Sequence, residues 1–109
     1  MVMSKIPVYF MPGLAASPTI FENIKLPEDQ FEMHFLEWFL PNDKESIESY
    51  ALRMTDKIQD ENPVLVGVSF GGILVQEMAK HIKTQNVIII SSVKSNTEFP
   101  PRLKIELIL

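Results

Sequence analysis

The 109-residue sequence contains no cysteine, and this absence excludes several kinds of chemistry. Without a thiol the chain can form no disulfide and has no cysteine nucleophile, and a structural zinc site is disfavoured. The two histidines and the acidic residues also show no spacing typical of a metal site, so we expect neither a metal nor another cofactor. The lack of cysteine fits a reducing compartment, and we therefore expect a cytoplasmic location.

Long apolar runs and basic clusters are missing as well. No stretch approaches 18 consecutive apolar residues, so we expect no transmembrane helix and no membrane partner. The net charge is −4, from 10 basic and 14 acidic residues without a basic run, which disfavours nucleic-acid binding. With 46% hydrophobic and 22% charged residues, the composition is that of an ordinary globular protein, and we treat residues 1–109 as one domain or part of one.

Glycine is scarce, and the sequence concentrates it in one place. Three of the four glycines lie in the stretch Gly67-Val68-Ser69-Phe70-Gly71-Gly72. An apolar, β-branched run at 63–68 precedes Ser69, and apolar residues at helical spacing follow it over 70–83. The pattern is G-x-S-x-G between a strand and a helix, which predicts a strained turn that exposes the serine hydroxyl. The alternative is a glycine-rich turn in which Ser69 only caps the helix.

The remaining chain alternates between strand and helix signals. This alternation predicts an α/β fold with a mostly parallel sheet and flanking helices. In Asn42 and Glu45, three residues apart, we find the pattern of a capping box at the start of a helix. The continuous apolar run from Val87 predicts a strand that is buried on both faces. The expected strands are 6–11, 31–38, 63–68 and 86–92, and the expected helices are about 18–23, 44–59 and 70–83.

With these elements in place, residues 5–95 resemble the N-terminal half of an α/β-hydrolase. The resemblance rests on the strand–Gly67-Val68-Ser69-Phe70-Gly71–helix unit and on the glycine-ended strand before it. Met11-Pro12-Gly13-Leu14-Ala15 is similar to the oxyanion loop of that family, with Pro12 where histidine is common. The resemblance implies that Ser69 is the nucleophile and that the backbone N–H groups of Leu14 and Phe70 form the oxyanion hole. It also implies the strand order second, first, third, fourth.

The resemblance implies acyl transfer by a serine, a histidine and a carboxylate, in which the acid and the histidine come from later strands. The apolar ending Leu103–Leu109 lacks a polar tail, and we expect the chain to be cut short before those residues. His34 lies inside a strand, and His81 lies about 18 Å along the helix from Ser69. Neither is expected to act as the base, so we expect the 109-residue chain to be inactive alone.

The function predicted for the complete protein is a serine hydrolase of esters, thioesters or amides, with a small-molecule acyl substrate. The alternatives are a non-catalytic binding domain of the same fold and an acyltransferase. Trp38, just after a strand, is a candidate for lining the substrate pocket. Asp60 is expected to be a solvated surface charge. The fourth strand has no evident neighbour in the sequence, so self-association through its edge is also expected.

Overall fold

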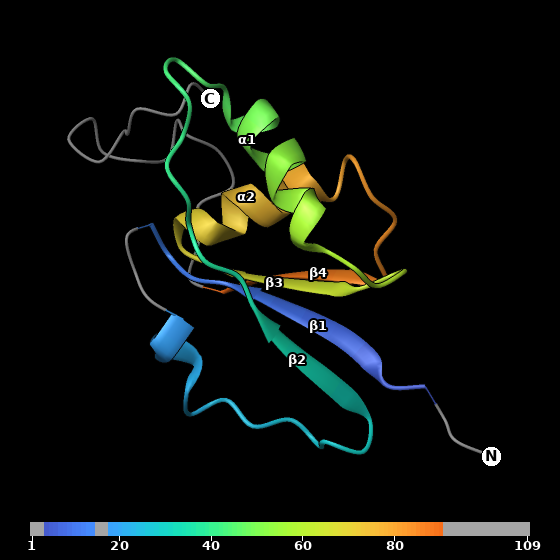
Figure 1. The fold of residues 1–109 in the computed structure, drawn as a ribbon. Coiled ribbons are helices and arrows are strands. Elements are labelled where there is room, and N and C mark those ends of the chain that lie inside the picture. Colours follow the sequence, from blue (N-terminus) through green and yellow to red (C-terminus); the bar gives the residue numbers. More distant parts are fainter. Residues whose placement is uncertain (1–3, 15–17, 91–109) are drawn as a thin grey trace.

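The computed structural model describes residues 4–14 and 18–90, and this part of the chain is built on one sheet of four parallel strands (Figure 1). The strands lie in the order β2-β1-β3-β4, so the predicted α/β class and the predicted strand order are both confirmed. The elements are β1 (Ile6–Met11), η1 (Pro18–Phe21), β2 (Phe31–Phe35), α1 (Ile47–Met54), η2 (Thr55–Lys57), β3 (Val64–Val68), α2 (Phe70–Met78) and β4 (Asn86–Ile90).

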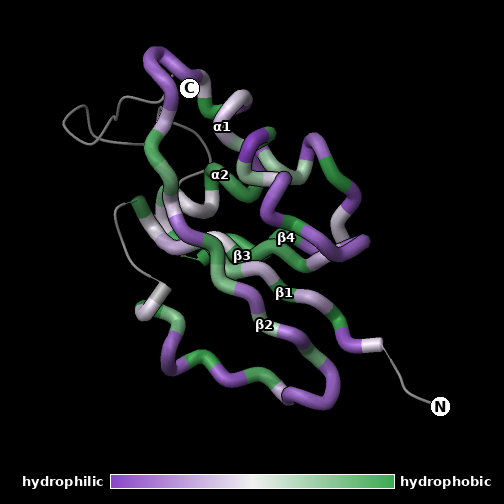
Figure 2. The backbone as a smooth tube through the Cα atoms, viewed as in Figure 1, coloured by the Kyte–Doolittle hydropathy of each residue, from purple (hydrophilic) through white to green (hydrophobic). Residues whose placement is uncertain are grey.

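Different segments pack on the two faces of the sheet. Helices α1 and α2 lie on one face, and η1 with the segment leading to β2 lies on the other (Figure 1). Because side chains alternate along a strand, β1 sends Tyr9 and Met11 to the helix side and Val8 and Phe10 to the other side. Apolar colouring accordingly concentrates on the central strands and on α2, whose residues are mostly buried (Figure 2).

Both helices are shorter than the sequence predicts. Helix α1 begins after Ser46, whose hydroxyl accepts the Ser49 N–H, and not after Asn42. Half of the expected capping box is nevertheless present, because Glu45 accepts the Asn42 N–H at 2.9 Å. The backbone cannot be helical there, since Lys44 has a φ of 55°. A 3-10 turn at Thr55–Lys57 then ends α1, and α2 ends at Met78 instead of running to residue 83.

Two strand predictions also need correction. Strand β2 ends at Phe35, and the segment 36–46 leaves the sheet edge to cross toward α1 (Figure 1). Strand β4 is not buried on both faces: Ile88, Ile89 and Ile90 remain 39–47% exposed. The reason is its place at the edge of the described sheet, where only β3 pairs with it. Residues 91, 92 and 103–109, for which we expected a strand end and an apolar tail, lie outside the described residues.

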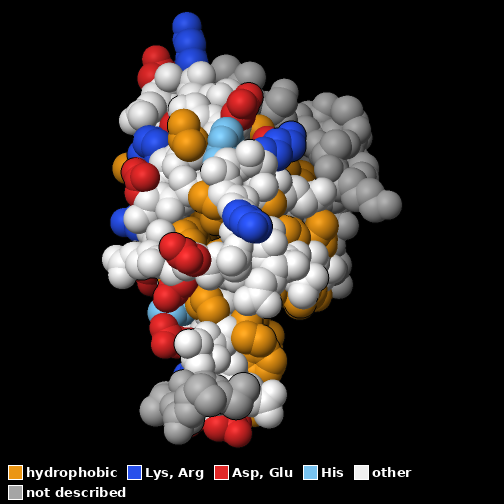
Figure 3. Space-filling view, turned by 90° about the vertical axis from the view of Figure 1, so that its right-hand side faces the viewer, with side chains coloured by type: hydrophobic (Ala, Val, Ile, Leu, Met, Phe, Trp, Pro, Cys, Tyr) orange, Lys and Arg blue, Asp and Glu red, His pale blue; other side chains and the backbone are white. Residues whose placement is uncertain are grey.

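The surface of the described part mixes charges of both signs with small apolar patches, as the space-filling view of one face shows (Figure 3). Lysine and arginine side chains are scattered on this face and form no continuous stripe. Among the described residues, no helix has the length and apolar character needed to span a bilayer.

Candidate active site

Ser69 occupies the turn between β3 and α2 with a backbone that side-chain-bearing residues rarely adopt. Its φ is 56° and its ψ is −126°. This conformation is essentially restricted to glycine elsewhere, and it persists only where the surrounding structure enforces it. The predicted strain at Ser69 is therefore present, and the Ser69 residue is exposed at the end of the sheet. A simple N-capping role is not supported, since the Ser69 side chain makes no capping hydrogen bond to α2.

The two glycines of the motif make room for this turn. A Cβ on Gly67 would lie 2.3 Å from the Gly71 carbonyl oxygen, so the end of strand β3 touches the first turn of α2. A Cβ on Gly71 would lie 2.4 Å from the Pro12 oxygen and 2.5 Å from the Met11 oxygen. Real Cβ atoms do not approach backbone this closely, so both positions require glycine. The glycines thus bring together the serine turn and the loop that follows β1.

The loop after β1 lies directly against Ser69. A Cβ on Gly13 would be 3.4 Å from the Ser69 Cβ and 3.9 Å from its Oγ. Leu14 follows and packs against the helix-side core. Phe70, on the other side of the serine, is the first residue of α2, where helical N–H groups point out of the helix end. The structure therefore brings Leu14, Ser69 and Phe70 to the carboxyl end of two neighbouring strands, β1 and β3.

Trp38 has a role at this loop that its sequence position does not reveal. Its indole N–H is shared between the carbonyl oxygens of Pro12 at 3.0 Å and Gly13 at 2.9 Å. The indole ring also stacks on Phe70, with 5.7 Å between ring centroids and 11° between planes. One side chain therefore contacts residues on both sides of Ser69. Trp38 also lines a pocket of about 500 Å³, but Ser69 is not among the residues that line it.

The two histidines lie away from the serine. His34, on β2, stacks on Tyr9 and places its Nε2 2.6 Å from a Glu32 oxygen. His81 follows the end of α2, where its backbone N–H donates to the Met78 carbonyl. Its buried Nε2 has no hydrogen-bond partner within the described part of the chain. The structure thus brings neither imidazole into the group formed by Leu14, Ser69 and Phe70.

One carboxylate differs from its predicted role. Asp60 is not a free surface charge: it accepts a hydrogen bond from the Tyr9 hydroxyl at 2.6 Å and lies 3.5 Å from His34 Nε2. Burial, together with this bond to Asp60, raises the pKa of the Tyr9 phenol, which keeps it a hydrogen-bond donor. Sequence spacing could not find this contact, because Tyr9 and Asp60 are 51 residues apart.

No protein-family model matches the chain, and no curated protein matches it either.

Proposed function

We propose that the chain carries the nucleophile and the oxyanion hole of a serine hydrolase of the α/β-hydrolase type. The observation that carries this proposal is the Ser69 backbone, with φ 56° and ψ −126°, between a parallel strand and a helix. The strain costs free energy, on the order of 1–3 kcal/mol, and it occurs at an exposed residue. A strained, exposed serine in a G-x-S-x-G turn is the arrangement that α/β-hydrolases use for acyl transfer.

The proposed chemistry is acyl transfer from an ester, thioester or amide. The Ser69 Oγ attacks the carbonyl carbon while a histidine takes its proton, and the carbonyl oxygen becomes an oxyanion. The N–H groups of Leu14 and Phe70 donate to this oxygen. The leaving group then departs with the proton from the imidazolium, which leaves an acyl-enzyme that water hydrolyses through the same histidine.

Trp38 supports the oxyanion hole in this proposal. In a trans peptide the carbonyl and the following N–H point in opposite directions. A hydrogen bond from Trp38 that fixes the Gly13 carbonyl therefore also fixes the direction of the Leu14 N–H. Because an oxyanion hole acts through donors that are already oriented, Trp38 serves as a positioning residue and not as a reacting group.

The base and its acid partner are not supplied by the described residues in this proposal. His34 is engaged by Glu32 and Asp60, and His81 lies beyond the far end of α2. We therefore propose that the 109-residue chain has no useful turnover on its own, since loss of the base removes several orders of magnitude in rate. A cytoplasmic location is also proposed, on the absence of cysteine.

Covalent labelling by a fluorophosphonate tests the proposal. Where the open reading frame continues past residue 109 and supplies a histidine and an acid, we expect Ser69 of its product to be labelled and the Ser69→Ala variant to remain unlabelled. Intact-mass and peptide mass spectrometry measure this result. Ser4→Ala, at an exposed serine before β1, is the matched control and should label like the unaltered protein. The 109-residue chain should label at least about 10³-fold more slowly.

Absence of labelling at Ser69 in that folded product would contradict the hydrolase proposal and favour the non-catalytic binding domain. An acyltransferase would also label, so a second measurement separates it from a hydrolase. The acyl-enzyme of an acyltransferase should turn over faster with an added alcohol or thiol acceptor than with water alone.

We also propose that the 109-residue chain self-associates through β4. This strand ends the described sheet, and Ile88, Ile89 and Ile90 are exposed along it without a charged residue among them. An apolar, uncharged edge strand is a template for pairing with a second copy.

We expect Ile89→Lys to raise the monomer fraction at least about fivefold in size-exclusion chromatography with light scattering, because a charge opposes edge pairing. Leu40→Lys, at a residue that is 89% exposed outside the strands, should change nothing. A monodisperse, cooperatively melting monomer would contradict this prediction.

A further inference from the structure

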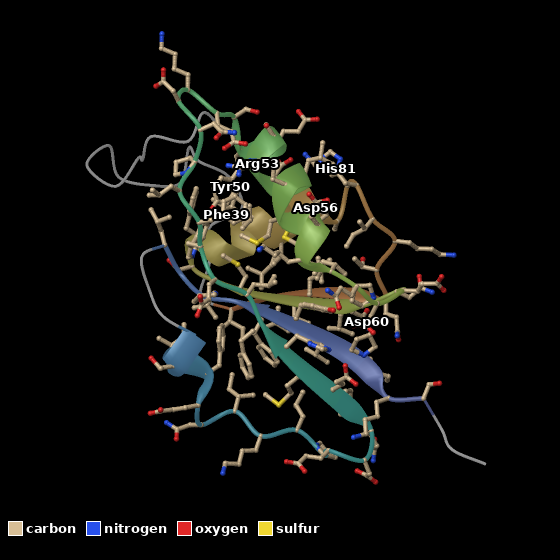
Figure 4. The ribbon with its side chains drawn as sticks, in the orientation of Figure 1. Phe39, Tyr50, Arg53, Asp56, Asp60 and His81 are labelled. Atoms are coloured by element: carbon tan, nitrogen blue, oxygen red, sulfur yellow. The ribbon has the colours of Figure 1, made fainter. Side chains whose placement is uncertain are left out.

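A histidine and two carboxylates from separate parts of the chain converge on the helix side of the sheet. Glu32 and His34 are two residues apart on β2, so their side chains leave the same face of the sheet. The β1–β2 register places Tyr9 directly beside His34. Asp60, in the connection between η2 and β3 and labelled in Figure 4, reaches the same place, because it lies 2.6 Å from the Tyr9 hydroxyl and 3.5 Å from His34 Nε2. Folding therefore assembles this group from segments that the sequence keeps apart.

The potential ligand atoms are close to the spacing that a small cation needs. One atom each from Glu32, His34 and Asp60 lies within 4.8 Å of the other two. A tetrahedral ion with bonds of about 2.0–2.1 Å needs ligand atoms roughly 3.3 Å apart. His34 Nε2 and the nearer Asp60 oxygen are 3.5 Å apart, while the Glu32 oxygen is at 2.6 Å from Nε2. The Glu32 side chain is 53% exposed and can move outward by the required fraction of an ångström.

Two of the three groups are held in place by Tyr9. Its hydroxyl donates to the Asp60 oxygen at 2.6 Å and accepts the Gln59 N–H at 3.2 Å. Its ring stacks on the His34 imidazole, with 4.5 Å between centroids and 13° between planes. Tyr9 itself is only 3% exposed, so this support is fixed by the core. Supporting contacts of this kind orient metal ligands and lower the entropic cost of binding.

We propose that Glu32, His34 and Asp60 form a binding site for a divalent transition-metal ion, with Zn²⁺ as the best match. One imidazole nitrogen and two carboxylate oxygens suit Zn²⁺, whereas Ca²⁺ and Mg²⁺ prefer oxygen ligands throughout. Three protein ligands leave a fourth position for water. The competing interpretation is an imidazolium that pairs with both carboxylates and binds no metal.

This site is separate from the serine site. Asp60 precedes β3 and Ser69 follows it, so the length of the strand lies between them. The five residues of β3 correspond to roughly 16 Å at the usual rise of a strand. The metal proposal therefore does not depend on the hydrolase proposal, and either can fail without the other.

Isothermal titration of the full, tag-free chain with Zn²⁺ tests the site. We expect one ion per chain with a Kd in the micromolar range, because three partly exposed ligands bind more weakly than a closed structural site. His34→Gln, Asp60→Asn and Glu32→Gln should each weaken binding at least about tenfold. The matched controls are His81→Gln, at the other histidine, and Glu37→Gln, at an exposed carboxylate after β2, and both should stay within about twofold.

A second measurement keeps the test independent of any folding defect. In the unaltered chain, Zn²⁺ should shift the ¹⁵N resonance of the His34 Nε2 and leave the His81 ring unchanged. Glu32→Gln alters an exposed side chain and should fold normally by circular dichroism. The proposal is overturned if the unaltered chain binds Zn²⁺ more weakly than about 1 mM. It is also overturned if Glu32→Gln and His34→Gln bind as tightly as the unaltered chain.

Discussion

Replacing Gly67 by alanine should destabilise the protein by about 4 kcal/mol or more and abolish cooperative folding at 37 °C. The added Cβ would lie 2.3 Å from the Gly71 oxygen and 2.6 Å from the Gly72 Cα. These are backbone atoms of the first turn of α2, and they cannot move without separating the helix from β3. Because β3 and α2 fix Ser69 between them, the serine turn would be lost together with the fold.

Urea denaturation followed by circular dichroism measures this effect. Gly13→Ala is the matched control, because its Cβ would meet the Ser69 Cβ at an ordinary 3.4 Å. We expect this control to cost less than about 1 kcal/mol. Equal unfolding midpoints for Gly67→Ala and the unaltered chain would show that the close contact between β3 and α2 is not present in solution.

The second large effect is expected at Glu45, which anchors the segment that carries Trp38. Glu45 has a side chain only 2% exposed, and its two oxygens accept from Arg53 at 2.6 and 2.8 Å. It also accepts from the Asn42 N–H at 2.9 Å and from the Ser49 hydroxyl at 3.0 Å. The Arg53 guanidinium, on α1, in turn lies over the Phe39 ring at 4.5 Å, and Figure 4 labels both side chains.

These hydrogen bonds, led by those from Arg53, lower the pKa of the Glu45 carboxyl to about 2. A folded-state pKa below the unfolded one stabilises the fold above the unfolded value of about 4.5. This contribution is then lost as the pH falls from about 4.5 to about 2. Since Arg53 is 37% exposed, solvent screening reduces the contribution to about 2–3 kcal/mol.

We therefore expect Glu45→Gln to lower the free energy of unfolding by about 2–3 kcal/mol at pH 7. The difference from the unaltered chain should shrink as the pH is lowered from 5 toward 2, because the native carboxyl is then protonated as well. Urea titrations at pH 7, 5 and 3 measure the difference at each pH. Glu48→Gln, at an exposed acidic residue of α1, is the control and should cost little at any pH. A difference that is constant with pH would contradict the linkage to Glu45.

The sequence by itself determined the class of the fold and the serine turn. Alternating strand and helix signals predicted the parallel sheet, and the glycines at 67 and 71 predicted the turn at Ser69, which the backbone angles confirm. These features depend on local chemistry: side-chain periodicity sets the element type, and only glycine allows backbone to approach so closely. Such signals lie within a few residues of the structure that they produce.

Contacts between distant segments decided the rest, and no local pattern encodes them. Helix α1 starts late because Lys44 takes a left-handed backbone, while the Glu45 carboxylate accepts a hydrogen bond from Arg53, eight residues along the chain. Trp38 reaches the Pro12 and Gly13 carbonyls across 26 and 25 residues, respectively. Asp60 joins Tyr9 and His34 only because the β1–β2 register and the entry to β3 bring them together. The tertiary structure therefore determined both the support of the proposed oxyanion loop and the proposed metal site, since packing alone sets which side chains meet.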